Sequence, residues 1–137
     1  MELTLIKQFD NSFKLAYDSD LEKAKKLKPN SILKCKITRP RNVGFHRKYF
    51  ALIEMIYQNQ SHYKNRGHLR IDLQKSAGFY TERVTVYGEV IQEPTSISFS
   101  SMDEDEFQNL YSRVLDEIVT TFHFDKQDII DNVNQYF

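Results

Sequence analysis

The chain has 137 residues, of which 40% are hydrophobic and 13% aromatic, and its 19 basic and 19 acidic residues leave no net charge. This length and composition fit a single globular domain, residues 1–137, with a modest core. The sequence lacks both a run of roughly 20 apolar residues, which a membrane-spanning helix needs, and an apolar secretory signal, so we expect a cytoplasmic protein without a membrane partner. The lone Cys35 excludes an internal disulfide.

The zero net charge hides a strong segregation along the chain. Residues 31–75 carry ten Lys or Arg against Glu54 and Asp72, a net charge of +8, whereas residues 103–137 carry two basic residues against nine acidic ones, a net charge of −7. Such a chain can bind a polyanion locally, or it can pair its basic and acidic surfaces across a subunit interface. The sequence leaves both explanations open.

The first predicted elements are a β-hairpin and a short helix. Apolar residues alternate on both sides of the turn-forming cluster 10–12: Leu3, Leu5, Phe13, Leu15 and Tyr17. Ser19 or Asp20 can cap a helix that runs from Leu21 to Leu27 and ends before Pro29.

Residues 31–58 predict a strand followed by a helix. Residues 32–38 place Leu33, Cys35 and Ile37 on one side, which is the period of a half-buried strand. Pro40 ends this strand, and Asn42 is a candidate N-cap for a helix over 43–58. The apolar stripe of that helix contains Phe45, Tyr49, Leu52, Ile53 and Ile56.

The start of the 43–58 helix is unusual because it is basic. A helix N-terminus carries partial positive charge and ordinarily favours acidic neighbours. Here the free backbone N–H groups would be flanked by Arg39, Arg41, Arg47 and Lys48, which together would suit a phosphate. The alternative is a solvated basic loop that only maintains solubility.

The pattern of residues 59–137 predicts three more helices and a set of strands. We expect a polar loop at 58–67, a short helix at 68–77 closed by Gly78, and a β-meander or hairpin within 83–100. Ser101 and Glu104 have the spacing of a capping box for a long helix over 102–122. Asp125 and Asp128 can cap a last helix, whose apolar residues are Ile129, Ile130, Val133, Tyr136 and Phe137.

Patterns typical of catalysis are missing from the sequence. The four histidines and Cys35 show no metal-ligand spacing, and no Gly-rich phosphate loop or Gly-x-Ser-x-Gly motif is present. The acidic residues 103–106 resemble a nuclease cluster, but a helix start explains them without chemistry. We therefore expect a non-enzymatic protein without a cofactor or a metal.

The remaining pattern favours nucleic acid. Basic side chains track a phosphate backbone while aromatic rings stack on unpaired bases, as in proteins that bind single strands. Phe50 and Tyr57 could supply such rings, or they could simply widen the core face of their helix. The candidate DNA-binding residues are Lys34, Lys36, Arg39, Arg41, His46, Arg47 and Lys48.

Three stretches carry a resemblance to a known family: residues 37–52 (ITRPRNVGFHRKYFAL), 77–80 (AGFY) and 96–107 (SISFSSMDEDEF). Together they resemble small proteins of unknown function encoded by tailed bacteriophages and prophages. More remotely, the order of elements is similar to the phage lambda NinB (Orf) recombination mediators, which bind single-stranded DNA and the host single-strand-binding protein as dimers. The positions matching those mediators are Asn42, Arg47, Lys48, Ser100, Met102, Glu106, Phe107 and Leu110.

The resemblance implies a phage DNA-metabolism factor and adds Asn42 to the candidate DNA-binding residues. We expect an α+β fold in which an antiparallel sheet, built from the N-terminal hairpin, strand 32–38 and strands 83–100, is covered on one face by helices 43–58 and 102–122. The expected ligand is single-stranded or branched DNA. The alternative function is binding of a host protein, either a single-strand-binding or replication factor that it recruits or a defence enzyme that it inhibits.

A homodimer is also expected. Two copies could cover each other's apolar C-terminal segments and pair the basic and acidic blocks, which would double the basic surface. The competing interpretation folds the C-terminal helix back onto its own chain.

Overall fold

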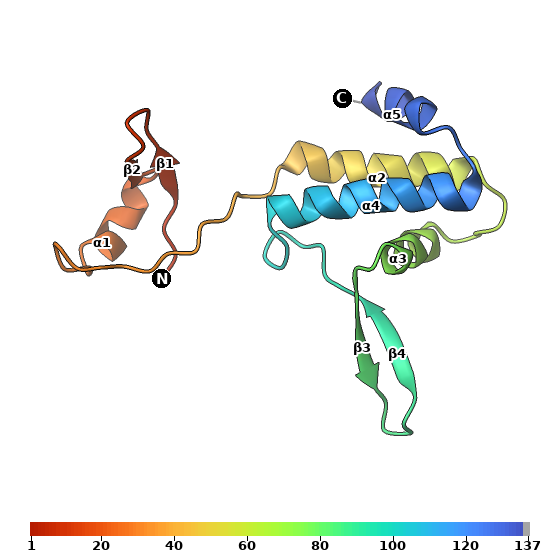
Figure 1. Cartoon of the computed structure of the whole chain (residues 1–137), viewed down its shortest axis with the longest axis horizontal. Helices are drawn as coiled ribbons and strands as arrows, with labels where there is room; N and C mark the ends of the chain where they lie inside the picture. The colour runs from red at the N-terminus through yellow and green to blue at the C-terminus, as the bar shows by residue number, and fades with distance from the viewer. Residues whose placement is uncertain (136–137) are drawn as a thin grey trace. The chain divides into compact units, whose positions relative to one another are not determined.

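The computed structural model describes residues 1–135, and its internal contacts group into two compact units, Met1–Lys36 and Ile37–Phe137. Figure 1 shows the helices and strands of each unit. The single domain expected from chain length stays a prediction. Among the described residues, no helix is both long enough and apolar enough to cross a bilayer.

The first unit contains the predicted hairpin, with β1 (Leu5–Lys7) paired antiparallel to β2 (Phe13–Leu15), followed by the 3-10 turn η1 (Asp18–Asp20) and the helix α1 (Leu21–Ala24). The carboxylate of Asp20 accepts hydrogen bonds from the Thr4 N–H and the Lys23 ammonium, each at 3.0 Å, instead of capping α1. No hydrophobic side chain within residues 1–36 is buried, so polar contacts and turns hold this unit together.

The strand predicted over residues 32–38 is wrong. Residues 31–42 form neither helix nor strand, and the side chains of Ile32 and Ile37 are 100% and 70% exposed. A strand exists only where a neighbouring strand supplies hydrogen bonds and where its apolar face is covered. Among the described residues no strand pairs with this segment, so its alternating pattern does not lead to a strand.

The second unit is built on four helices, α2 (Val43–Gln58), α3 (Arg66–Ser76), α4 (Glu104–Phe122) and α5 (Lys126–Asn134). Each begins after a side chain that accepts a hydrogen bond from the backbone N–H three residues later: Asn42, Asn65, Asp103 and Asp125. The caps predicted at Asn42 and Asp125 are confirmed. The cap predicted at Ser101 lies two residues too early, because Asp103 provides it.

One core joins α2 and α4, as expected. Leu52, Leu110 and Ile118 are completely buried, and Phe45 packs against them with its ring 5.6 Å from that of Phe107. Figure 1 shows the two helices lying side by side, starting at the same end. The apolar stripes of α2 and α4 pack against each other and not against a sheet.

The α+β class is confirmed, but the expected single sheet is wrong. Strand β3 (Tyr80–Val84) pairs only with β4 (Val90–Pro94), with Val84 opposite Val90, and residues 96–100 form no strand. The two hairpins are therefore separate two-stranded sheets. The buried Gln74 of α3 fastens the base of the second hairpin, because its Nε2 donates to the carbonyls of Phe79 and Thr95 at 3.1 and 2.7 Å.

The C-terminal helix α5 packs on its own chain. Ile129 and Val133 are 5% and 0% exposed and belong to the same core as α2 and α4. This agrees with the competing interpretation, and these side chains are not available for a dimer contact in this conformation. Tyr136 and Phe137, which the dimer prediction also used, lie outside the described residues.

Candidate nucleic-acid interface

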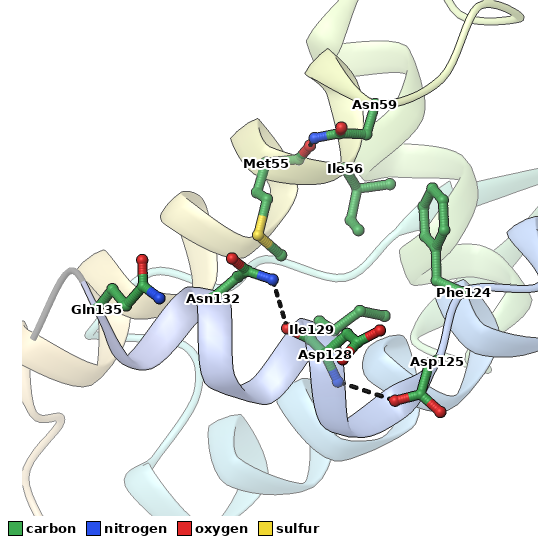
Figure 2. A pocket seen from close by; sticks show the side chains of 9 residues that line it. All are labelled: Met55, Ile56, Asn59, Phe124, Asp125, Asp128, Ile129, Asn132 and Gln135. Atoms are coloured by element: carbon green, nitrogen blue, oxygen red, sulfur yellow. Dashed lines mark hydrogen bonds between the residues drawn. The ribbon is translucent and has the colours of Figure 1, made fainter.

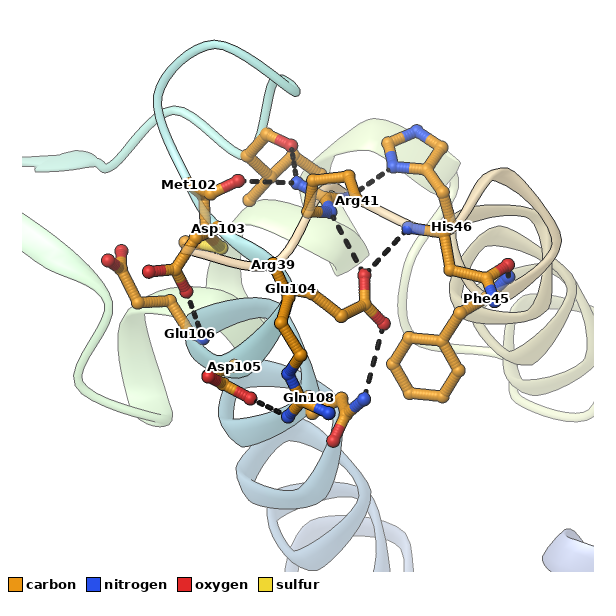
Figure 3. A network of polar contacts seen from close by, with 12 residues as sticks. Arg39, Arg41, Phe45, His46, Met102, Asp103, Glu104, Asp105, Glu106 and Gln108 are labelled. Carbon is orange, nitrogen blue, oxygen red and sulfur yellow. Dashed lines mark hydrogen bonds and ion pairs between the residues drawn. The ribbon is translucent and has the colours of Figure 1, made fainter. Parts of the chain in front are cut away.

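A buried arginine links the starts of α2 and α4. The Arg41 side chain is 1% exposed, and its Nη1 donates to the Ile97 carbonyl at 2.7 Å. Its Nη2 lies 2.7 Å from His46 Nδ1, and its Nε lies 3.9 Å from Glu104 Oε2 (Figure 3). Arg41 is thus enclosed by its own chain.

The carboxylate of Glu104 lies at the start of α2, where the sequence predicts a bound phosphate. Its Oε2 accepts the backbone N–H of Asn42 at 2.7 Å, directly before α2, while the Glu104 N–H donates to the Arg39 carbonyl at 3.3 Å. The positive end of the α2 dipole and the Arg41 guanidinium therefore have an internal counter-charge. The basic helix start is explained by a residue that follows much later in the sequence.

Aromatic rings enclose the same arginine. The Arg41 guanidinium carbon lies 3.6 Å from the Phe107 ring centroid and 4.9 Å from that of Phe99. The His46 ring stacks on Phe107 at 5.5 Å with an interplanar angle of 20°. Cation–π attraction strengthens where the cation is desolvated, as it is here.

Arg41 also sets the protonation of His46. A guanidinium can only donate hydrogen bonds, so Nδ1 of His46 accepts and the ring proton lies on Nε2. Burial lowers the pKa of His46, and the charge of Arg41 lowers it further. His46 is therefore neutral in the folded protein at neutral pH.

We expect this neutral histidine to make the stability depend on pH. The unfolded imidazole binds a proton near pH 6.5, but the folded one does so only at lower pH. The stabilisation is therefore complete above about pH 6.5 and is lost as the pH falls through the folded pKa. Thermal unfolding of the wild type and of His46→Gln between pH 8 and pH 5 measures the difference, since Gln can accept from Arg41 without titrating. Parallel pH profiles for the two proteins would contradict the assignment.

Two exposed aromatic side chains also lie next to the His46 ring. Phe50 is 40% exposed and Phe99 49% exposed, and their ring centroids lie 5.0 and 5.1 Å from that of His46. The Arg70 guanidinium carbon lies 6.0 Å from the Phe50 ring centroid. Arg47, which is exposed, precedes Phe50 by three positions on α2 and so shares its side of the helix. We call Phe50, Phe99, His46, Arg47 and Arg70 the aromatic surface.

The family model described as "Protein of unknown function (DUF1367)" matches residues 59–135, more than half of the chain. The chain belongs to the DUF1367 family. No curated protein and no solved structure matches it. The matched DUF1367 region contains Phe99, Glu104 and Phe107, whereas Arg41 and α2 precede it.

Three of the candidate residues predicted for this DUF1367 member are engaged in contacts within the second unit. Arg41 and Asn42 hold the helix starts together, and Arg39 forms an exposed ion pair with Asp105. A phosphate contact by Arg41 would require this network to open. Lys34 and Lys36 belong to the unit of residues 1–36.

The remaining predicted residues lie on α2. Arg47 is exposed, and the half-buried Lys48 has its Nζ 5.7 Å from the Tyr111 ring centroid. Tyr57 packs against the core and donates from its hydroxyl to the Lys64 carbonyl at 3.0 Å, which fits the alternative that it widens the core face.

Sequence reasoning missed Phe99 and Arg70 as members of this surface. The sequence pattern places Phe99 in a predicted strand. Arg70 lies in a predicted helix, and nothing else in the sequence indicates a binding role for it. The hydroxyl-rich neighbours of Phe99 were the one available sign, since an aromatic residue between Ser98 and Ser100 lies in a stretch typical of an exposed loop.

A separate hollow lies between α2 and α5 (Figure 2). This hollow has a volume of about 370 Å³ and an apolar floor that includes Met55, Ile56 and Ile129. Asp125 at its edge already caps α5, because its Oδ1 accepts the Asp128 N–H at 3.0 Å. Among residues 1–135, no group of three or more His, Cys, Asp or Glu side chains is arranged to hold a metal ion.

Proposed function

We propose that this DUF1367 protein binds single-stranded or branched DNA as a non-enzymatic accessory factor of phage DNA metabolism, in the cytoplasm of a bacterial host. The observation that carries the proposal is the pair of exposed rings, Phe50 and Phe99, that both contact the His46 ring. Exposed aromatic rings at close spacing are the platform on which unpaired bases stack.

Basic side chains support this assignment at the same surface. Arg47 and Arg70 are placed to approach a phosphate backbone while bases stack on the rings. Arg39 and Arg41 are engaged within the chain, so fewer of the predicted arginines are available to a phosphate backbone. We therefore propose a binding mode in which stacking contributes more than charge, with a shallow dependence on salt.

The resemblance to phage proteins and to the NinB mediators supports the same proposal. Two of the three stretches that carry it, residues 77–80 and 96–107, lie within the DUF1367 match. The second of these contains Phe99 of the aromatic surface.

Replacing either exposed ring should weaken DNA binding. We expect Phe50→Ala and Phe99→Ala each to reduce the affinity for a fluorescein-labelled single-stranded oligonucleotide by about 5- to 150-fold, since stacking contributes about 1–3 kcal/mol per base. Anisotropy titration at fixed salt measures the change. Phe9→Ala is the matched control because Phe9 is fully exposed in the first unit.

This titration tests both the site and the function. Equal losses in Phe9→Ala and in the two surface variants would remove the site assignment, and no binding of the wild type to any form of DNA would remove the function. In that case, capture of a host protein that survives nuclease treatment would favour the alternative of a protein-binding factor. Arg41 is unsuitable for such tests because it is buried and bonded within its own chain, so its replacement should change stability as well as binding.

A further inference from the structure

The hairpin β3–β4 is anchored at its base, where β4 lies against α3, and is exposed towards its turn. Gln74 fixes the base, but towards the turn the side chains of Val84 and Val90 are 68% and 63% exposed. Figure 1 shows the hairpin projecting from the helices of its unit. A two-stranded sheet alone is marginally stable in water, and exposed edges with apolar residues favour pairing with another strand.

The register determines which backbone groups are free. Thr85 N–H donates to Glu89 O at 2.8 Å, and Thr95 N–H donates to Phe79 O at 3.1 Å, at the two ends of the hairpin. Hydrogen-bonded pairs alternate along an antiparallel ladder, so the N–H and C=O groups of every second residue point outward. On β3 the outward residues are Tyr80, Glu82 and Val84, and on β4 they are Val90, Gln92 and Pro94.

The outer edges of β3 and β4 differ in the residue that would lie opposite its own copy if two hairpins paired. A two-fold axis at the centre of β3 sets Glu82 opposite its own copy, and like charges directly opposite each other are destabilising. A two-fold axis at the centre of β4 sets Gln92 opposite its own copy, where the two neutral amides can bond to each other. The edge of β4 is therefore the self-complementary one.

We propose that β4 pairs antiparallel with β4 of a second copy about a two-fold axis at Gln92, which joins two hairpins into one four-stranded sheet. Each Gln92 exchanges both backbone hydrogen bonds with the partner's Gln92. Each Val90 N–H donates to the carbonyl of the partner's Pro94. Pro94 has no N–H to donate, and its position at the end of the paired stretch limits that loss.

Side chains are complementary in this register. Val90 lies between its own Val84 and the partner's Pro94, and the partner's Tyr80 lies beyond that proline, so each end of the new sheet carries an apolar row. On the other face Ile91 lies opposite the partner's Glu93. No like charges lie directly opposite each other in the paired stretch, and the exposed Val90 gains an apolar neighbour. This interface does not depend on DNA binding.

Gln92→Pro tests the interface with the protein's own hairpin intact. Its N–H points outward, so proline there removes the central bonds between copies while sparing those between β3 and β4. Glu82→Pro is the matched control, since Glu82 lies opposite Gln92 within the hairpin and its N–H also points outward. By light scattering at high micromolar concentration, we expect the mass of a dimer for the wild type and Glu82→Pro, and half that mass for Gln92→Pro.

Cross-linking provides a second measurement that requires no disruption of the sheet. In a Cys35→Ser background, Gln92→Cys places two thiols at a hydrogen-bonded pair, whose Cα atoms lie about 5.5 Å apart, within the range of a disulfide. We expect mild oxidation to give a disulfide-linked dimer for Gln92→Cys and not for Glu82→Cys. A monomeric wild type, an unchanged mass for Gln92→Pro, or equal cross-linking at the two positions would overturn the proposal.

Discussion

Replacing Glu104 by alanine is expected to lower the free energy of unfolding by about 3–5 kcal/mol, the range measured when one partner of a buried ion pair is removed. The Glu104 residue is 6% exposed and the Arg41 side chain 1% exposed, so the substitution leaves a guanidinium enclosed without its counter-charge. It also leaves the Asn42 N–H without its acceptor at the start of α2. Urea denaturation followed by circular dichroism measures the loss.

Two variants separate burial from charge in this experiment. Asp105→Ala removes the neighbouring acid, whose ion pair with Arg39 is exposed, and should leave the unfolding midpoint almost unchanged. The double variant Arg41→Met with Glu104→Leu replaces both charges by apolar groups and should recover much of the stability, because desolvation of the pair no longer has to be offset. Equal destabilisation by Glu104→Ala and Asp105→Ala would refute this role of Glu104.

Phe107→Ala should be comparably destabilising, by about 3–5 kcal/mol, because it empties a completely buried site. The Phe107 ring contacts Arg41 on one side and packs edge-on against Phe45 and Tyr49. Its loss removes core volume and the cation–π partner of the buried guanidinium together. Phe107→Leu keeps most of the volume and should cost clearly less.

The matched control for Phe107 is Phe99→Ala. Phe99 also faces Arg41, at 4.9 Å, but is 49% exposed, so its removal opens no cavity and should change the denaturation midpoint little. The pair of variants also separates stability from binding, because Phe99→Ala should weaken DNA binding while it remains folded. Similar losses of stability in the two variants would contradict the burial argument.

Local signals account for what the sequence predicted well. The bounds of α2, residues 43–58, follow from one cap and one apolar stripe, and both act within a few residues. The cap of α5 at Asp125 and the end of α3 before Gly78, whose φ is +92°, are equally local.

Non-local partners account for the errors. The alternation of residues 32–38 expresses a propensity, but a strand needs a second strand that the pattern cannot name. The basic start of α2 suggested an external anion because its internal one, Glu104, is brought there only by the fold. The sequence pattern assigns Glu104 to a capping box at the start of its own helix, and this local role gives no sign of its contact with the start of α2.

The shared start of α2 and α4 also determines how the chain must be connected. The Asn42 N–H, directly before α2, donates to the Glu104 carboxylate in the first turn of α4, and the two helices lie side by side from that end, so they run in the same direction (Figure 1). Parallel neighbours cannot be joined by a short turn, because the chain must first travel back along the full length of α2. Residues 59–103 make this return journey, and α3 and the second hairpin are parts of it. Residues 59–103 must therefore span at least the length of α2, whereas the hairpin turn beyond Val84 can vary in length without moving either helix.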